Sequence, residues 1–142
     1  MLLLLLAACG GGLTGHWTGN IACGDEDAQG VLSFDLDLEK EDDDSYVGTG
    51  LIGFSGVFEI SGAMRDYVST QTLDPVELSL EAPSGAQQVE MTGTVVECHT
   101  TIDGEESDQG CGNDSVTYAF DWDGADTLAF AEGDCAGDLS RD

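Results

Sequence analysis

Basic residues are almost absent from this chain. Of its 142 residues only three are Lys or Arg, against 29 Asp or Glu, which gives a formal net charge of −26. Such a negative surface repels a phosphate backbone, so the composition excludes nucleic acid as a partner. It also repels anionic lipid headgroups, so we do not expect the folded domain to lie flat on a membrane.

Helical patterning and catalytic motifs are also lacking. No stretch of ten or more residues carries an apolar stripe at helical spacing. Neither histidine, His16 or His99, belongs to a local Ser-His-acid motif, and no G-x-S-x-G sequence occurs. No two cysteines have the C-x-x-C spacing of a zinc or redox site. We therefore expect a protein that is not an enzyme, with no cofactor and no dedicated metal site.

The apolar run at the N-terminus is too short to span a membrane. Seven apolar residues, 2–8, precede Cys9, whereas a membrane-spanning helix needs about twenty. The run fits the core of an export signal followed by small residues. Leu6-Ala7-Ala8-Cys9 resembles the lipobox of bacterial lipoproteins, in which the cysteine is acylated and becomes the new N-terminus. The resemblance implies a signal peptide at 1–8, a lipidated Cys9 with a glycine-rich tether at 9–13, and an acidic domain at 14–142.

This resemblance also predicts a location. Two or three acyl chains, palmitate among them, would anchor the protein stably through Cys9 in the bacterial cell envelope, and we expect the outer membrane. Export signals normally begin with positive charge, and no Lys or Arg precedes the run, which leaves open a start upstream of Met1. The alternative is a buried N-terminal strand with an incidental cysteine.

The remaining cysteines form an even set, which suits two disulfides in an oxidising compartment. One pairing joins Cys98 to Cys111 across a polar segment and Cys23 to Cys135 near the two ends of the domain. In a strict meander with the strands counted below, Cys23 and Cys135 would fall at opposite ends. Four cysteines allow three pairings, and the sequence does not choose among them.

From Leu13 onward the apolar residues recur with a period of two. In residues 31–39, apolar side chains alternate with Ser33, Asp35, Asp37 and Glu39, which describes a half-buried strand with an acidic outer face. The same alternation predicts strands at 58–64, 76–80, 89–95, 116–122 and 128–130, and a glycine-rich, bent strand at 46–54. Turn residues separate these runs, at 41–45, 55–56, 74–75, 83–85 and 123–124. Two polar segments, 24–30 and 99–113, are expected to be mobile loops.

This pattern predicts an all-β fold, an antiparallel meander of about eight strands that closes as a barrel or packs as a sandwich. Gly15-His16-Trp17, with Arg141 near the other end of the chain, resembles the lipocalin and wider calycin pattern. In that family a G-x-W tryptophan closes one end of an eight-stranded barrel and an arginine from the last strand stacks across it. We therefore favour a lipocalin-like barrel over a β-sandwich, with Trp17 and Arg141 as the closing residues.

Two functional hypotheses follow. In the first, the anchored barrel binds a small hydrophobic ligand in a cavity lined by Trp17, Leu32, Phe34, Leu36, Ile60, Met64, Tyr118 and Phe120. In the second, it is a structural or interaction protein of the envelope without a cavity, whose acidic surface binds cations or a basic partner. The acidic runs 25–27 and 42–44 could hold calcium loosely at millimolar levels. An enclosed apolar cavity of about 300 Å³ or more would favour the first hypothesis.

Overall fold

The computed structural model describes residues 12–24, 29–81, 87–107 and 114–142, without the side chains of Ile60 and Glu81. In this part of the chain the secondary structure is entirely β, and no helix is present that could cross a membrane. The strands are β1 (Gly15–Gly24), β2 (Gln29–Asp42), β3 (Ser45–Ile60), β4 (Ala63–Glu81), β5 (Gln87–Ile102), β6 (Glu105–Glu106), β7 (Ser115–Trp122), β8 (Thr127–Glu132) and β9 (Cys135–Arg141).

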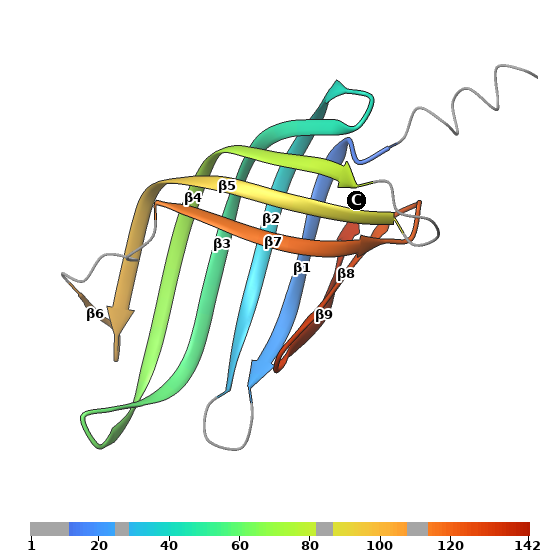
Figure 1. Ribbon diagram of the computed structural model, residues 1–142. Coiled ribbons are helices and arrows are strands. Elements are labelled where there is room, and N and C mark those ends of the chain that lie inside the picture. The colour runs from blue at the N-terminus through green and yellow to red at the C-terminus, as the bar shows by residue number, and fades with distance from the viewer. Residues whose placement is uncertain (1–11, 25–28, 82–86, 108–113) are drawn as a thin grey trace, which may run out of the picture.

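Eight of these strands close into an antiparallel barrel (Figure 1). Neighbours in the chain pair from β1 to β5, then β5 pairs with β7, β7 with β8 and β8 with β9. The last strand, β9, pairs with β1 and completes the ring. The two-residue strand β6 adds only to the tip of β5. The prediction of an all-β meander barrel is confirmed, and the barrel is compatible with a lipocalin-like architecture.

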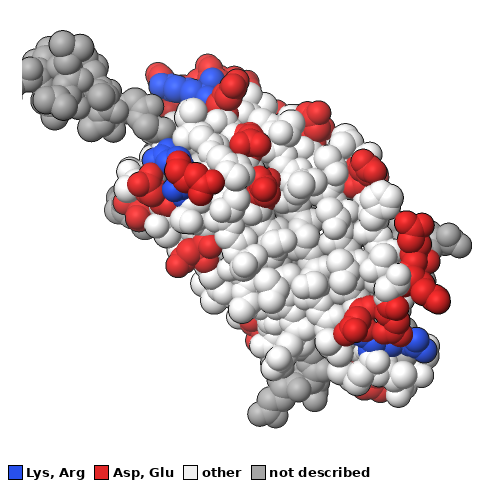
Figure 2. All heavy atoms as spheres, turned by 180° about the vertical axis from the view of Figure 1, so that it is seen from behind, with Lys and Arg blue, Asp and Glu red and all other residues white. Residues whose placement is uncertain are grey.

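The two-residue alternation explains why these strands form a barrel with one core. On β2, Phe34, Leu36 and Leu38 are buried, while the intervening Asp35 and Asp37 are exposed. Closing the sheet brings the buried apolar side chains into one cluster and gives every strand of the ring a partner on both sides. The carboxylates stay in water, and Figure 2 shows them towards the ends and margins of the face it displays, around a broad area with few charges.

The strand predicted at 58–64 is wrong, because this segment is a hairpin. Ser61 and Gly62 have φ values of 54° and 82°, the left-handed pair typical of a tight hairpin turn. They end β3 and begin β4, which reverses the chain in the middle of the expected strand. Met64, predicted to face inward, therefore lies on the outer face and is 58% exposed. The side chain of Ile60 lies outside the described part of the structure.

Two expected turns lie inside strands instead. Residues 55–56 continue β3, and Asp74-Pro75 lies within β4, where the pairing with β5 shifts register between Leu73 and Val76. A bulge of this kind absorbs the proline without ending the strand. The bend expected at 46–54 corresponds to a register shift between Gly48 and Gly50. A Cβ at Gly48 would overlap the carbonyl oxygen of Asp37, so the close approach of β2 requires glycine there.

The expected loop at 99–113 is shorter than predicted. Strand β5 continues to Ile102, a turn follows at Asp103 (φ 51°) and Gly104 (φ 84°), and β6 pairs back onto β5. The Asp103 carboxylate accepts hydrogen bonds from Arg65 Nη1 (2.8 Å) and from the backbone N–H of Asp66 (3.0 Å), which lowers the pKa of Asp103. Residues 108–113 lie outside the described segments, as do 25–28 of the other expected loop.

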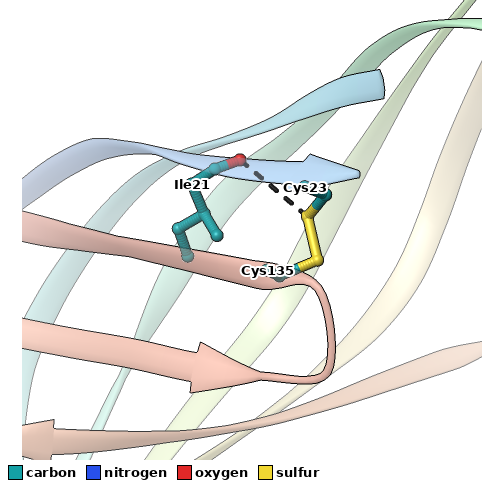
Figure 3. Close-up of a disulfide and its surroundings, with 3 residues drawn as sticks. All are labelled: Ile21, Cys23 and Cys135. Atoms are coloured by element: carbon teal, nitrogen blue, oxygen red, sulfur yellow. Dashed lines mark hydrogen bonds between the residues drawn. A yellow bond between two sulfur atoms is a disulfide. The ribbon is translucent and has the colours of Figure 1, made fainter. Parts of the chain in front are cut away.

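Cys23 and Cys135 meet where the C-terminal strand β9, which was not predicted, pairs with β1. Cys135 begins β9 directly opposite Cys23 near the end of β1, and the two form a disulfide with a Cα–Cα separation of 4.0 Å (Figure 3). The three strands predicted at 46–54, 58–64 and 76–80 are only two, β3 and β4, so one strand fewer separates Cys23 from Cys135. Both cysteines therefore lie at the same end of the barrel, which removes the geometric difficulty of this pairing. Cys98 is also disulfide-bonded, and its predicted partner Cys111 lies outside the described residues.

Removing the Cys23–Cys135 disulfide should destabilise the fold markedly. The bond spans 112 residues, and cross-linking a loop of that length restricts the unfolded chain by about 4 to 5 kcal/mol. We expect the double variant Cys23→Ala/Cys135→Ala to lose free energy of unfolding of this order, measured by urea titration. The exposed neighbouring pair Ala22 and Ala136, changed to serine, is the control and should be nearly neutral. A loss below about 1 kcal/mol in the cysteine variant would contradict the expectation.

Candidate ligand-binding site

One half of the barrel is solid. At the end where β1 begins, eight inward side chains expose 0% of their surface, and Leu38 and Tyr46 expose 3% and 4%. The eight include two residues predicted to line a cavity, and the set is Leu13, Trp17, Leu36, Val76, Leu78, Met91, Leu128 and Leu139. This half is packed core and has no room for a ligand.

Trp17 and Arg141 close this half. The guanidinium carbon of Arg141 lies 5.0 Å from the centre of the Trp17 ring, within cation–π distance. The indole N–H of Trp17 donates to the carbonyl oxygen of Leu13 (2.9 Å), which folds the segment before β1 across the end. Direct pairing of Trp17 with Arg141 between β1 and β9 brings the two side chains together.

The Arg141 guanidinium also donates hydrogen bonds to the surrounding backbone. Its Nη1 donates to the carbonyl oxygens of Gly12 (2.6 Å) and Thr14 (3.0 Å), and its Nη2 donates to that of Ala125 (2.8 Å). Its Nε donates to Asp126 Oδ1 (2.9 Å). With only 15% of its side chain exposed, Arg141 links the segment before β1 to the β7–β8 turn. A lysine has neither the planar fork nor enough donors for this task.

Four aromatic rings cross the middle of the barrel and form what we call the floor cluster: Phe34, Tyr118, Phe120 and Phe130. Phe34 on β2 meets Tyr118 on β7 edge to face, with ring centres 5.2 Å apart, and Phe120 at 5.8 Å. Phe130 on β8 lies 5.9 Å from Tyr118 and 5.7 Å from Phe120. Burial raises the pKa of the Tyr118 hydroxyl, which therefore stays neutral. The floor cluster separates the solid half from the rest of the interior.

Beyond the floor cluster the wall formed by the described strands is incomplete. Strand β7 pairs with β5 only along residues 87–94 of β5, and it pairs with β8 at only two positions, Asp121 and Trp122. The longer strands β3, β4 and β5 continue past these short ones, as Figure 1 shows. We call the space along their inner faces, beyond the floor cluster, the open half of the barrel. A ligand could enter here, at the mouth of the barrel.

Aromatic side chains line the open half, and we call Phe54, Phe58 and Tyr67 the rim cluster. Phe54 and Phe58 on β3 stack with ring centres 5.6 Å apart, and Tyr67 on β4 lies 6.2 Å and 6.0 Å from them. All three are partly exposed. A hollow of about 310 Å³ lies beside them and is lined by Cys23, Gly24, Gly30, Phe54, Phe58, Asp134 and Cys135. It is widely open to solvent and is not the enclosed cavity expected for the first hypothesis.

A polar band faces the interior between the floor and rim clusters. Ser69 and Thr100 are paired across β4 and β5 and are 7% and 6% exposed. Gln71, the next inward residue on β4, has a buried Oε1 with no hydrogen-bond partner within the described part of the chain. An unpaired buried acceptor costs about 1 to 3 kcal/mol. A ligand or water that donates a hydrogen bond at this position would remove that cost.

Six of the eight predicted lining residues face the interior, at three different levels, whereas Met64 lies on the outer face and the side chain of Ile60 is not described. Trp17 and Leu36 are core; Phe34, Tyr118 and Phe120 form the floor cluster with Phe130; and Leu32 is half-buried against the core from the open half. The rim cluster and Gln71 were missed by the sequence analysis. The spacing of Phe54 and Phe58, four residues apart on one strand, could have indicated a shared face, had the turn expected at 55–56 not separated them.

Two carboxylates contact the imidazole of His16 on the described surface. His16 Nε2 lies 2.7 Å from Asp35 Oδ1, and Nδ1 lies 2.7 Å from Asp142 Oδ2. Hydrogen bonds to Asp35 and Asp142 raise the pKa of His16 above 6.5. The acidic run 42–44, predicted to hold calcium loosely, forms an exposed turn between β2 and β3, and 25–27 lies outside the described residues.

Comparison with known proteins adds no relative. The sequence matches no protein-family model, no curated protein and no solved structure. The geometry of the barrel and the motifs in the sequence are therefore the basis for the proposed function.

Replacing Arg141 with lysine should destabilise the closed end of the barrel. We expect Arg141→Lys to lower the free energy of unfolding by about 2 kcal/mol, because the carbonyl oxygens of Gly12, Thr14 and Ala125 lose charged donors and Trp17 loses its stacked guanidinium. Urea unfolding measures the change. Arg65→Lys is the matched control: Arg65 forms one exposed ion pair with Asp103, at 44% and 45% exposure, and should cost less than about 1 kcal/mol. Equal effects at the two arginines would argue against a closing role for Arg141.

Proposed function

We propose that this protein is an exported, lipid-anchored binding protein whose barrel takes a small hydrophobic ligand into its open half. The observation that carries the proposal is the division of the barrel interior. One half is solid core. Among the described residues, the other half has an incomplete wall, an aromatic rim, an aromatic floor and a buried acceptor without a partner. Apolar walls with a few polar groups are typical of small-molecule sites.

Export is supported by the disulfide and by the lipobox-like residues. Disulfides persist in oxidising compartments and are rare in the cytosol, so Cys23–Cys135 favours a location outside the cytoplasm. Leu6-Ala7-Ala8-Cys9 then supplies a lipid anchor, and residues 9–13 supply a tether. The proposed location is the bacterial cell envelope, with the barrel held near the outer membrane by its acyl chains.

The charge and the polar band restrict the ligand. A net charge of −26 disfavours the approach of anions, so carboxylate-bearing lipids are poor candidates. Gln71 Oε1 is a buried acceptor that does not line the hollow, so a ligand that donates to it would have to extend from the rim cluster into the polar band. A hollow of about 310 Å³ fits a molecule of one or two rings or a short chain. The ligand class is therefore a small, uncharged, largely apolar molecule with one N–H or O–H group.

The neutral probe N-phenyl-1-naphthylamine, which has two aromatic groups and one N–H, should bind saturably with one site per barrel. Phe54→Ala should weaken the binding about tenfold, because the lost ring contact contributes about 1 kcal/mol or more. Fluorescence titration measures the dissociation constant. Leu51→Ala is the matched control, because Leu51 lies on the outer face of the same strand at 45% exposure. Lack of saturable binding, or an equal loss in both variants, would reject the open half as the site and favour the envelope protein without a cavity.

Protein isolated from its bacterial host should carry the anchor. Intact-mass spectrometry should show a chain that begins at Cys9 and bears two or three acyl chains, because the lipobox-like residues direct cleavage and acylation there. A Cys9→Ala variant should lack the acyl mass and leave the membrane fraction, while its barrel retains the fold. An unmodified Cys9 thiol in the native product would disprove the lipoprotein assignment without affecting the ligand site.

A further inference from the structure

A histidine and three aspartates gather on the outer face of the barrel near its closed end. His16 on β1 pairs directly with Asp37 on β2, and Asp35 is the next outward residue on β2. Asp142, after the end of β9, donates its backbone N–H to the carbonyl oxygen of His16 (3.0 Å). Because Trp17 faces the core, its neighbour His16 faces outward in the same row as these carboxylates.

The donor atoms of this group are close enough to share one ion. One ligand atom from each of His16, Asp35 and Asp37 lies within 4.8 Å of the others. Ligand atoms about 2.0 to 2.1 Å from a tetrahedral zinc lie about 3.3 Å apart, so small rotations of these side chains would bring them into place. The side chains of His16 and Asp35 are 38% and 51% exposed, which gives a hydrated ion access.

The fourth residue, Asp142, orients the imidazole. Its carboxylate accepts the Nδ1–H of His16 at 2.7 Å, which directs Nε2 towards Asp35. A carboxylate that holds the second ring nitrogen is the usual partner of a metal-binding histidine, because it fixes the ring and raises the basicity of the ligand nitrogen. This contact separates the group from the purely acidic runs elsewhere on the surface, none of which includes a held imidazole in the described part of the chain.

We propose that His16, Asp35 and Asp37 bind a divalent transition-metal ion, with zinc the best match, and that Asp142 acts as a positioning residue for the imidazole. One nitrogen and two carboxylate oxygens suit zinc better than calcium, which takes six to eight oxygen ligands. Water would complete the coordination. The metal site lies at the closed end and on the outside, so it is independent of the proposed ligand site in the open half.

Zinc titration of the chelator-treated full chain at pH 8 and physiological salt tests the proposal. Calorimetry should show one tight equivalent per chain, distinct from weak binding to the acidic surface. His16→Gln and Asp37→Asn should each weaken this equivalent at least about tenfold, and Asp142→Asn should also weaken it about tenfold. His99→Gln is the matched control. His99 is exposed and lies 2.9 Å from Glu97, but among the described residues it belongs to no set of three potential metal ligands. It should leave zinc affinity unchanged.

A second measurement separates binding from folding. Thermal melts of the metal-free variants should stay close to that of the parent, since the substituted side chains are partly or fully exposed. Zinc should raise the melting temperature of the parent and of His99→Gln by the same amount, and that of the three site variants less. In nitrogen-15 spectra, zinc should shift Nε2 of His16 and leave His99 unchanged. Equal weakening in His16→Gln and His99→Gln, an affinity that no variant changes, or calcium binding as tightly as zinc would overturn the proposal and assign the cation binding to diffuse acidic charge.

Discussion

Closure between the first and last strands is the constraint on which the rest of the barrel depends. Strands β1 and β9 are at opposite ends of the domain sequence, yet every other pairing in the ring follows chain order. Two contacts fix this seam at its two ends: the stacking of Arg141 on Trp17 and the Cys23–Cys135 disulfide. Without the seam the meander would be an open sheet with two exposed edges and an unshielded core face.

The seam also positions both proposed sites. At its Trp17 end the strands close tightly over packed side chains, and the same register places His16 between carboxylates of β2 and the chain end. At its disulfide end the strands β8 and β9 stop, while β3, β4 and β5 continue. Unequal strand lengths therefore make one end of the barrel solid and leave the other open, although the alternation of side chains is the same throughout.

The negative charge of the surface influences which molecules can reach each proposed site. Carboxylates lie towards the ends and margins of the face in Figure 2, and the net charge of −26 repels anions. In the open half the rim cluster offers aromatic faces. Asp134 lines the hollow there, and Arg65, which is paired with Phe58 between β3 and β4, forms an ion pair with Asp103. A neutral molecule meets no electrostatic barrier there, whereas a cation would be attracted first to the outside. The two proposed sites thus select different partners from the same surroundings.

Local patterns in the sequence determined the class of fold. The alternation in residues 31–39 required a half-buried strand, and Gly15, Trp17 and Arg141 indicated a closed end, because period and residue type depend on neighbours along the chain. The tertiary structure alone decided which turns were real: Ser61-Gly62 reverses the chain, whereas residues 55–56 do not. It also decided the partner of Cys23, the unpaired acceptor of Gln71 and the meeting of His16 with Asp142. These depend on register between strands distant in sequence, which a one-residue change in strand boundaries would alter completely.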